Sequence, residues 1–185
     1  MATTVVCAVI LDSTLHVAWA GDSRCSIYRN GRLCRITRDH SQVQELVDQG
    51  LLSPEEAQRH PWAHRITKFL GRKEGPDAET RSWDLLPGDI IILHTDGLSD
   101  VLSDEGITQI IRSHQDDDLP FDDLPRRLVA AALSQGTRDN TSVLCCWHQP
   151  ESAITPLLPE QTITAGYRVE LAKVLFHFHM EMSHV

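Results

Sequence analysis

Residues 87–98, with the sequence PGDIIILHTDGL, decide the fold of this chain. Pro87-Gly88-Asp89 is a turn sequence, and residues 90–94 form an apolar run of strand length. A strand that is apolar on both faces is usually covered on both faces. We therefore predict a central strand over 90–94, with Asp96 and Gly97 directly after its end.

Strand patterns also fill the first third of the chain. Asp12-Ser13-Thr14 is a turn-type triplet, and Asn30-Gly31 is typical of a tight hairpin because both residues tolerate a positive φ. Apolar runs typical of strands lie on either side of these turns, at residues 3–11, 15–20, 25–29 and 32–37. We expect these strands to form an antiparallel meander.

The periodicity then changes to that of helices. Residues 41–49 carry apolar side chains at helical spacing. Ser53-Pro54-Glu55-Glu56 has the form of a capping box with proline at the first helical position, which predicts a second short helix running toward His60. Residues 61–83 mix turn and apolar residues, and we expect an irregular loop there with a short strand or two.

Helices dominate the part of the chain after the central strand. Ser103 is expected to cap a helix with acidic residues in its first turn, a further helix is predicted over 124–134, and residues 141–147 read as a last strand. Because the strands are grouped instead of alternating with helices, the sequence favours an α+β fold over a doubly wound one.

The composition changes after His148. Residues 149–159 hold three prolines, which is typical of a linker. Apolar residues at helical spacing over 169–182 predict a short amphipathic helix. We therefore expect a domain over residues 1–148 and a linker with a C-terminal tail over 149–185.

The overall composition excludes several classes of protein. The chain has 185 residues, of which 41% are hydrophobic and 23% charged, the balance of a globular protein rather than a disordered one. A formal net charge of −9 argues against a nucleic-acid or anionic-membrane binder, because phosphate groups are usually bound by a basic surface. We expect no membrane-spanning segment and no signal peptide. The five cysteines lack C-x-x-C spacing, so we expect buried free thiols and a cytoplasmic location.

Three aspartates lie where the predicted strands end. Asp22 follows the strand at 15–20, Asp96 follows the central strand, and Asp139 precedes the last strand. Brought together, their carboxylates would repel one another unless a hard divalent cation such as Mg²⁺ or Mn²⁺ compensates the charge. Each aspartate taken alone is also compatible with a turn or capping role.

An apolar strand that ends in Asp-Gly also resembles the nucleophile strand of haloacid-dehalogenase-type phosphatases. That mechanism requires a second aspartate two residues away from the first. Here the two candidate positions are His94 and Leu98, which excludes it.

Several short motifs together resemble one known family, although each alone is weak. They are Ala20-Gly21-Asp22-Ser23-Arg24, Thr37-Arg38-Asp39-His40-Ser41, residues 50–57 leading to His60-Pro61, Leu70-Gly71, Pro87-Gly88-Asp89, Thr95-Asp96-Gly97-Leu98 and Arg138-Asp139-Asn140-Thr141. Their order over residues 1–147 is similar to that of bacterial members of the protein phosphatase 2C (PPM) family of serine/threonine phosphatases.

This resemblance implies an α-β-β-α sandwich of two antiparallel sheets flanked by helices. It implies hydrolysis of phosphoserine or phosphothreonine in proteins by a metal-activated water, with Mg²⁺ or Mn²⁺ as cofactor. By resemblance, Asp96 and Asp139 are ligands of the first catalytic metal, and Asp22 together with Asp96 holds a further, weaker one. Gly97 and Asn140 lie beside these ligands.

The resemblance also identifies a flap, residues 43–70, as the variable segment beside the active site. The flap residues that we single out are Ser53, Pro54, Glu55, Glu56 and His60. No protein side chain is expected to act as a nucleophile, because such chemistry depends on charge stabilisation and positioning.

The chain departs from the family pattern at its N-terminal end. The family's domain begins earlier, with strands, two long helices and an Asp-Gly-x-Gly-Gly segment whose aspartate bridges two metals. No Asp-Gly-x-Gly-Gly occurs in the 185 residues. We therefore expect weak catalysis or none by this chain alone. We also expect an exposed sheet surface that the tail helix, another copy or a partner chain would cover.

Three interpretations of function remain open. The chain is a metal-dependent phosphatase that acts on phosphorylated proteins, a catalytically inactive pseudophosphatase that serves as a binding or regulatory module, or a nonfunctional remnant. Neither nucleic acid nor a membrane is expected as a partner.

Overall fold

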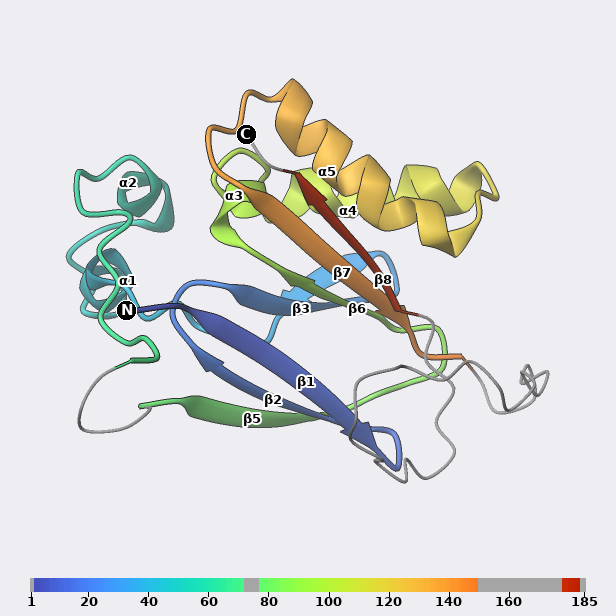
Figure 1. The fold of residues 1–185 in the computed structure, drawn as a ribbon, viewed down its shortest axis with the longest axis horizontal. Coiled ribbons are helices and arrows are strands. Elements are labelled where there is room, and N and C mark those ends of the chain that lie inside the picture. Colours follow the sequence, from blue (N-terminus) through green and yellow to red (C-terminus); the bar gives the residue numbers. More distant parts are fainter. Residues whose placement is uncertain (1, 72–76, 150–177, 184–185) are drawn as a thin grey trace.

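Two antiparallel sheets face each other in this chain, and helices cover the outer face of one of them (Figure 1). The structure is a computed structural model that describes residues 2–71, 77–149 and 178–183. The expected α+β class with two antiparallel sheets is confirmed. No helix of the described residues covers the outer face of the second sheet, so the sandwich is partial in this part of the chain.

The smaller sheet has three strands in the order β1-β2-β5. β1 (Val5–Leu11) and β2 (Thr14–Ala20) form a hairpin through Asp12 and Ser13, whose φ angles of 46° and 63° are those of a type I′ turn. β5 (Glu79–Asp84) pairs with the other edge of β2 and is the short strand expected within residues 61–83.

The larger sheet has five strands in the order β4-β3-β6-β7-β8. β3 (Arg24–Arg29) and β4 (Arg32–Arg35) form the predicted Asn30-Gly31 hairpin, in which both turn residues have positive φ. β6 (Ile90–His94) lies at the centre of the sheet. β7 (Thr141–Trp147) and β8 (Phe178–Ser183) follow on one side of β6.

The apolar run of β6 is explained by two cores that meet at this strand. Ile91 packs between the two sheets, in a cluster with residues of β2 such as Val17 and Trp19. Ile90 and Ile92 point to the opposite face and belong to the cluster under the helices. Because successive side chains of a strand alternate between its faces, a strand covered on both sides is apolar throughout.

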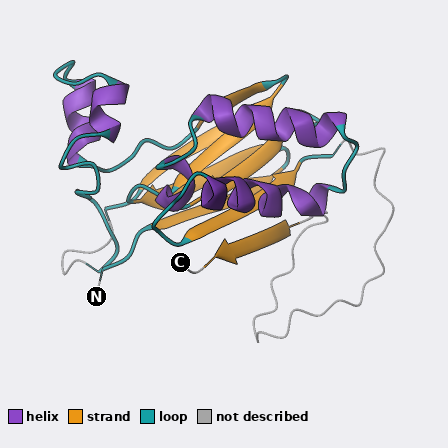
Figure 2. Ribbon diagram, turned by 90° about the horizontal axis from the view of Figure 1, so that it is seen from above, coloured by secondary structure: helices purple, strands orange, loops and turns teal. Residues whose placement is uncertain are grey.

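Two helices cover the outer face of the five-stranded sheet (Figure 2). They are α4 (Asp104–Asp116) and α5 (Leu124–Ser134), which follows the short 3-10 turn at Phe121–Asp123. Ser103 caps α4 as predicted, since its hydroxyl accepts a hydrogen bond from the Gly106 N–H. Ile111 and Leu128 pack fully buried against the sheet.

The flap projects from one end of the sheets (Figure 1). It contains most of α1 (Gln42–Asp48) and all of α2 (Pro54–Gln58), for which the predicted capping box of Ser53 and Glu56 is present. Both ends of the segment are held by backbone pairing: Ser41 pairs with Ile66, and Thr67 donates its N–H to the carbonyl of His40. The flap is therefore attached at its base.

The helix predicted over residues 169–182 is wrong at its C-terminal end. Residues 169–177 lie outside the described residues, as does most of the predicted linker, but residues 178–183 form β8, which pairs antiparallel with β7. The sequence contains the correct signal, because Phe178, Met180 and Met182 alternate with polar residues at the period of a strand. Unpaired backbone groups at the edge of β7 give such a strand its hydrogen-bond partners.

Two further expectations concern burial and membranes. Cys25, Cys145 and Cys146 are buried as expected, whereas Cys7 and Cys34 are exposed. Among the described helices, none combines the length and the hydropathy needed to cross a bilayer.

Candidate metal centre

The loops that follow β6 and precede β7 are joined at one end of the five-stranded sheet. Thr95, directly after β6, donates its N–H to the carbonyl of Ser142 and its hydroxyl to the carbonyl of Asn140. The Ser142 N–H in turn donates to the Thr95 hydroxyl. Because Asp96 and Asp139 are each one residue beyond this network, the pairing of the two strands brings their backbones together.

Gly97 fixes how closely these loops approach. A Cβ atom at this position would lie 2.6 Å from the carbonyl oxygen of Asn140 and 2.7 Å from the hydroxyl of Thr141, distances that real Cβ atoms do not show. Only glycine therefore allows this contact. The two positions named beside the aspartates, Gly97 and Asn140, are the point of contact between the two loops.

Asp22 reaches the same end of the structure from the turn between β2 and β3. The preceding Gly21 has a φ of 120° and exchanges hydrogen bonds with His40: its N–H donates to the imidazole Nδ1, and its carbonyl accepts from the His40 N–H. The His40 ring stacks on Trp19, with 5.8 Å between ring centroids. The turn that carries Asp22 is therefore held in place by its neighbours.

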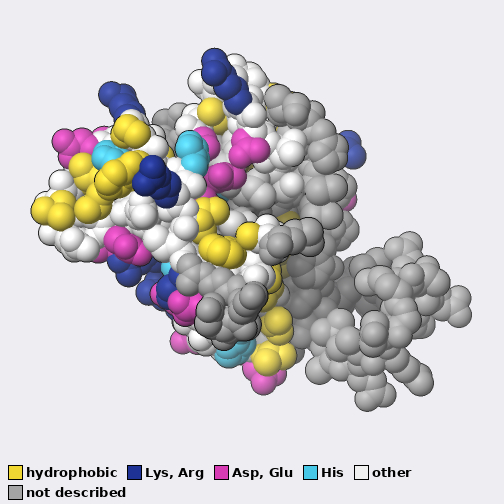
Figure 3. All heavy atoms as spheres, turned by 60° about the vertical axis from the view of Figure 1, so that its left-hand side comes forward, with side chains coloured by type: hydrophobic (Ala, Val, Ile, Leu, Met, Phe, Trp, Pro, Cys, Tyr) yellow, Lys and Arg dark blue, Asp and Glu magenta, His cyan; other side chains and the backbone are white. Residues whose placement is uncertain are grey.

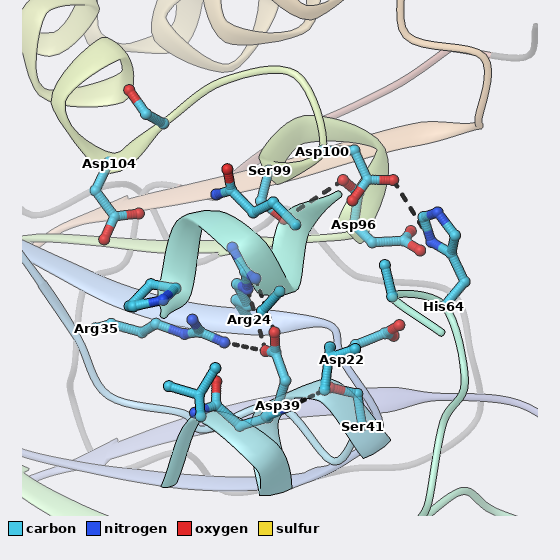
Figure 4. Close-up of a pocket in the computed structure, with 18 of the residues that line it drawn as sticks. Asp22, Arg24, Arg35, Asp39, Ser41, His64, Asp96, Ser99, Asp100 and Asp104 are labelled. Atoms are coloured by element: carbon cyan, nitrogen blue, oxygen red, sulfur yellow. Dashed lines mark hydrogen bonds and ion pairs between the residues drawn. The ribbon is translucent and has the colours of Figure 1, made fainter. Parts of the chain in front are cut away.

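The aspartates influence one another electrostatically. Burial, together with the neighbouring carboxylate of Asp96, raises the pKa of Asp22 to about 6. Burial and the charge of Asp139 raise the pKa of Asp96. Asp96 therefore lies close enough to Asp22 and to Asp139 to interact with both, and Figure 4 shows the side chains of Asp22 and Asp96 directed toward the same space. We call these three aspartates the acidic group. Among the described residues, only Asp96 of the three belongs to the group of possible ligand residues whose atoms lie within 4.8 Å of one another.

A cavity of about 560 Å³ is lined by Asp22, by Asp96 and by residues of the flap, whereas Asp139 is not among its lining residues. Acidic side chains gather beside a histidine on this face of the molecule (Figure 3). The lining side chains come from the strand ends, from α1 and α2, and from the start of α4; they include Asp22, Ser41, Pro54, His64, Asp96, Asp100 and Asp104. A substrate group of moderate size can enter such a space.

One wall of the cavity contains a network of two arginines around Asp39. Arg24 donates two hydrogen bonds to the Asp39 carboxylate, and Arg35 forms a second ion pair with it (Figure 4). Although burial acts in the opposite direction, these two guanidinium groups hold the pKa of Asp39 below its usual value. Two cations share the Asp39 carboxylate here, and Asp104 also interacts electrostatically with both arginines.

Two residues that were not predicted from the sequence, Asp100 and His64, also line this cavity. Asp100 caps the C-terminus of α3 (Asp96–Ser99), and its N–H donates to the Asp96 carbonyl at 2.8 Å. The Asp-x-x-x-Asp spacing, which puts both residues on one helical turn, is the signal that could have indicated it. His64 of the flap places Nδ1 3.9 Å from Oδ2 of Asp100. No local motif identified this histidine.

The flap residues named from the sequence have different positions. Pro54 lines the cavity. Ser53 and Glu56 stabilise the start of α2, and the imidazole of His60 accepts a hydrogen bond from the Trp62 N–H. Ser53, Glu55, Glu56 and His60 are not among the residues that line the cavity. The flap thus contributes to the site through α1 and through the residues around Pro54 and His64.

The donor chemistry of the acidic group fits a hard divalent cation. Carboxylate oxygens are the ligands that Mg²⁺ and Mn²⁺ prefer. Within the described ranges, no lysine or arginine forms an ion pair with Asp22, Asp96 or Asp139. Burial and, after it, repulsion between carboxylates raise the pKa values of Asp22 and Asp96, and a bound cation would supply positive charge that offsets this repulsion.

Fold and site together indicate a class of protein in which two antiparallel sheets pack face to face. In this class, aspartate carboxylates at the strand ends are suited to bind metal ions. A sequence model of the family described as protein phosphatase 2C matches residues 1–46 and 72–141. The chain belongs to the protein phosphatase 2C family. The unmatched residues 47–71 fall almost entirely within the flap.

Individual relatives show the same likeness. The protein phosphatase PhpP of Streptococcus pneumoniae is 36% identical over 143 residues, which is 77% of this chain and 56% of PhpP. The crystal structure of the serine/threonine phosphatase PstP/Ppp of Mycobacterium tuberculosis gives a TM-score of 0.67 at 34% identity and covers 76% of this chain and 57% of that one.

A second PstP structure bears on the metal. The catalytic domain of PstP in complex with two manganese ions is similar to this chain with a TM-score of 0.64 and 34% identity, over 78% of this chain and 58% of that one. Metal binding, with Mn²⁺ as one such metal, is thus shown for the family. The chain spans little more than half the length of PhpP and of these two structures.

Proposed function

We propose that this chain is the metal-binding part of a protein serine/threonine phosphatase, which removes phosphate from phosphoserine or phosphothreonine in a phosphorylated protein. The observation that supports the proposal most directly is electrostatic: in addition to burial, Asp96 raises the pKa of Asp22, Asp139 raises that of Asp96, and Asp22 and Asp96 line the same cavity. Membership of the protein phosphatase 2C family supports it.

The proposed roles divide between cation binding and positioning. Asp96 and Asp139 would hold one divalent cation, and Asp22 with Asp96 a further one. When bound, Mg²⁺ or Mn²⁺ supplies Lewis-acid activation of water and charge stabilisation at phosphorus. Gly97 and the Thr95 network keep the loops of Asp96 and Asp139 together. Arg24 and Arg35, which line the cavity beside Asp39, would offer guanidinium groups to an anionic substrate.

No side chain is required as a nucleophile, and the cysteines support this. Burial raises the pKa of Cys25 and of Cys146 to about 12, and it also raises that of Cys145. Thiols that stay protonated at neutral pH are poor nucleophiles. The two exposed thiols, Cys7 and Cys34, are free, and on that ground we propose a reducing compartment, the cytoplasm, as the location.

Two finer points belong to the same proposal. Activity of the 185-residue chain alone is expected to be weak, because no Asp-Gly-x-Gly-Gly segment occurs in it to supply the bridging carboxylate of the family. The second candidate function, a cation-binding regulatory module without turnover, is favoured by the same observation.

We also propose that the exposed outer face of β1 is covered by a second copy of the chain.

Hydrolysis of a phosphothreonine peptide in the presence of Mn²⁺ tests the proposal. We expect Mn²⁺ to stimulate phosphate release and Asp96→Asn to abolish it. Asp116→Asn is the matched control, since Asp116 is an exposed aspartate at the far end of α4. Mn²⁺ binding that depends on Asp96 without phosphate release would support the regulatory module. Mn²⁺ binding that is unaffected by Asp96→Asn would contradict both functions.

A further inference from the structure

A mixed group of possible ligands is found among the residues that line the cavity. One ligand atom each of His64, Asp96 and Asp100 lies within 4.8 Å of the others (Figure 4). Two carboxylates and an imidazole form a donor set that divalent transition-metal ions accept. The set includes Asp96 of the proposed centre, but it adds a nitrogen donor from a different part of the chain.

The two carboxylates of this group are held on one rigid element. Asp96 is the first residue of α3 and Asp100 its C-terminal cap, linked by the backbone hydrogen bond from the Asp100 N–H to the Asp96 carbonyl. Residues four apart lie on the same face of a helix. Both side chains therefore face the same space without further rearrangement.

His64 approaches this pair from the flap. Its neighbour Arg65 donates its N–H to the carbonyl of Trp62 at 3.0 Å and accepts the N–H of Gln42 at 2.9 Å. The Arg65 guanidinium lies 5.0 Å from the centre of the Trp62 ring. The backbone around His64 is thus fixed, while its side chain is 72% exposed and free to change rotamer.

We propose that His64 is a cation ligand, whose imidazole joins Asp96 and Asp100 on one divalent transition-metal ion. The bound ion then links the flap to the end of the five-stranded sheet. This inference rests on the proposed function in taking Asp96 as a cation ligand. It adds that the site prefers Mn²⁺ to Mg²⁺, because Mg²⁺ favours oxygen ligands and imidazole suits transition metals.

A simple surface ion pair between His64 and Asp100 is the alternative explanation of their proximity. At 3.9 Å and with both side chains exposed, such a pair contributes little to stability. The two explanations differ in their response to metal, since an ion pair gives the flap no dependence on Mn²⁺.

Mn²⁺ binding to the full chain, followed by electron paramagnetic resonance of the free ion, distinguishes them. We expect His64→Ala to weaken Mn²⁺ binding by at least about tenfold, the lower range seen when even indirect partners of a metal site are removed. The affinity for Mg²⁺, measured by competition with Mn²⁺, should fall by a smaller factor in the same variant. His16→Ala is the matched control, because His16 is an exposed histidine on β2 of the other sheet.

Hydrogen exchange of the flap amides gives a second readout that does not depend on activity. Mn²⁺ should slow exchange over residues 60–66 in the wild type and in His16→Ala, but not in His64→Ala. If the wild type and His64→Ala bind Mn²⁺ with equal affinity while Asp96→Asn no longer binds it, the proposed role of His64 is wrong. The proposed centre at Asp96 then remains supported. Absence of Mn²⁺ binding to the wild-type chain overturns the proposed centre and the role of His64 with it.

Discussion

At the scale of single residues, ionisation of the acidic group lowers the free energy of unfolding, and this effect depends on pH. The carboxyl of Asp22 has its pKa raised from 3.8 to about 6 by burial and by Asp96. A folded state that holds a proton more tightly than the unfolded state gains stability as the pH falls from the folded-state pKa, about 6, to the unfolded-state pKa of 3.8. Ionised Asp22 therefore costs the metal-free chain stability above about pH 6, and the cost disappears below about pH 4.

Asp22→Asn tests this cost. In the presence of a chelator we expect the variant to be more stable than the wild type by about 1–2 kcal/mol at about pH 7.5, because solvent screens part of the interaction, and equally stable near pH 4. Urea denaturation measures both. The comparison with the wild type is essential because burial lowers the pKa of His94 to about 4, so His94 titrates in the same interval with the opposite effect on stability. A stability difference that does not vary with pH would contradict the assignment.

A second residue-scale prediction concerns Gly97. Its Cβ in Gly97→Ala would meet the backbone of Asn140, so the two loops must separate. We expect a loss of about 1–3 kcal/mol in the free energy of unfolding, together with weaker Mn²⁺ binding because Asp96 and Asp139 move apart. Gly106→Ala is the control: its added Cβ meets nothing closer than 3.5 Å within α4, and helix propensity should make it neutral or stabilising. Unaltered Mn²⁺ binding in Gly97→Ala would show that this contact does not position the aspartates.

At the scale of elements, local patterns were sufficient wherever one physical signal dominated. The Asn30-Gly31 hairpin, the Ser53 capping box and the strand at 90–94 each follow from a strong local preference, and the structure contains all three. The sequence also indicated the acidic loops through the positions of Asp22, Asp96 and Asp139 at strand ends.

Elements whose signals compete, or whose contacts are distant in sequence, were harder to predict. The tail carries apolar residues at helical spacing over 169–182 and, over its last part, a strict alternation as well; the free edge of β7 decides in favour of a strand for residues 178–183. The position of His64 depends on backbone pairing between Ser41 and Ile66, which no motif encodes. Tertiary contacts therefore supply what the local sequence lacks.

At the scale of the whole molecule, the two sheets differ in how they are covered. α4 and α5 bury the outer face of the five-stranded sheet, but Cys7, Val9 and Leu11 leave the outer face of β1 apolar and exposed. Among the described strands, β1 pairs with β2 alone, so one of its edges is also free. Apolar faces beside free edges favour association with another chain.

Self-association through β1 is the expected result. Sedimentation equilibrium should show a dimer of the wild-type chain and a monomer when Val9→Lys and Leu11→Lys are combined, because charges on an edge strand oppose pairing. Leu133→Lys, an exposed leucine of α5, is the control and should remain dimeric. A wild-type chain that stays monomeric over the accessible concentrations would argue against a second copy as the cover of this face.

The attachment of the flap at its base has a consequence for how such chains diversify. Since Ser41 pairs with Ile66, the intervening residues 42–65 start and end at nearly the same point on the sandwich. Lengthening a surface loop with fixed ends costs little free energy. Such a segment can change in length and sequence while the carboxylate-bearing strands keep their alignment, which would let one scaffold acquire different recognition surfaces.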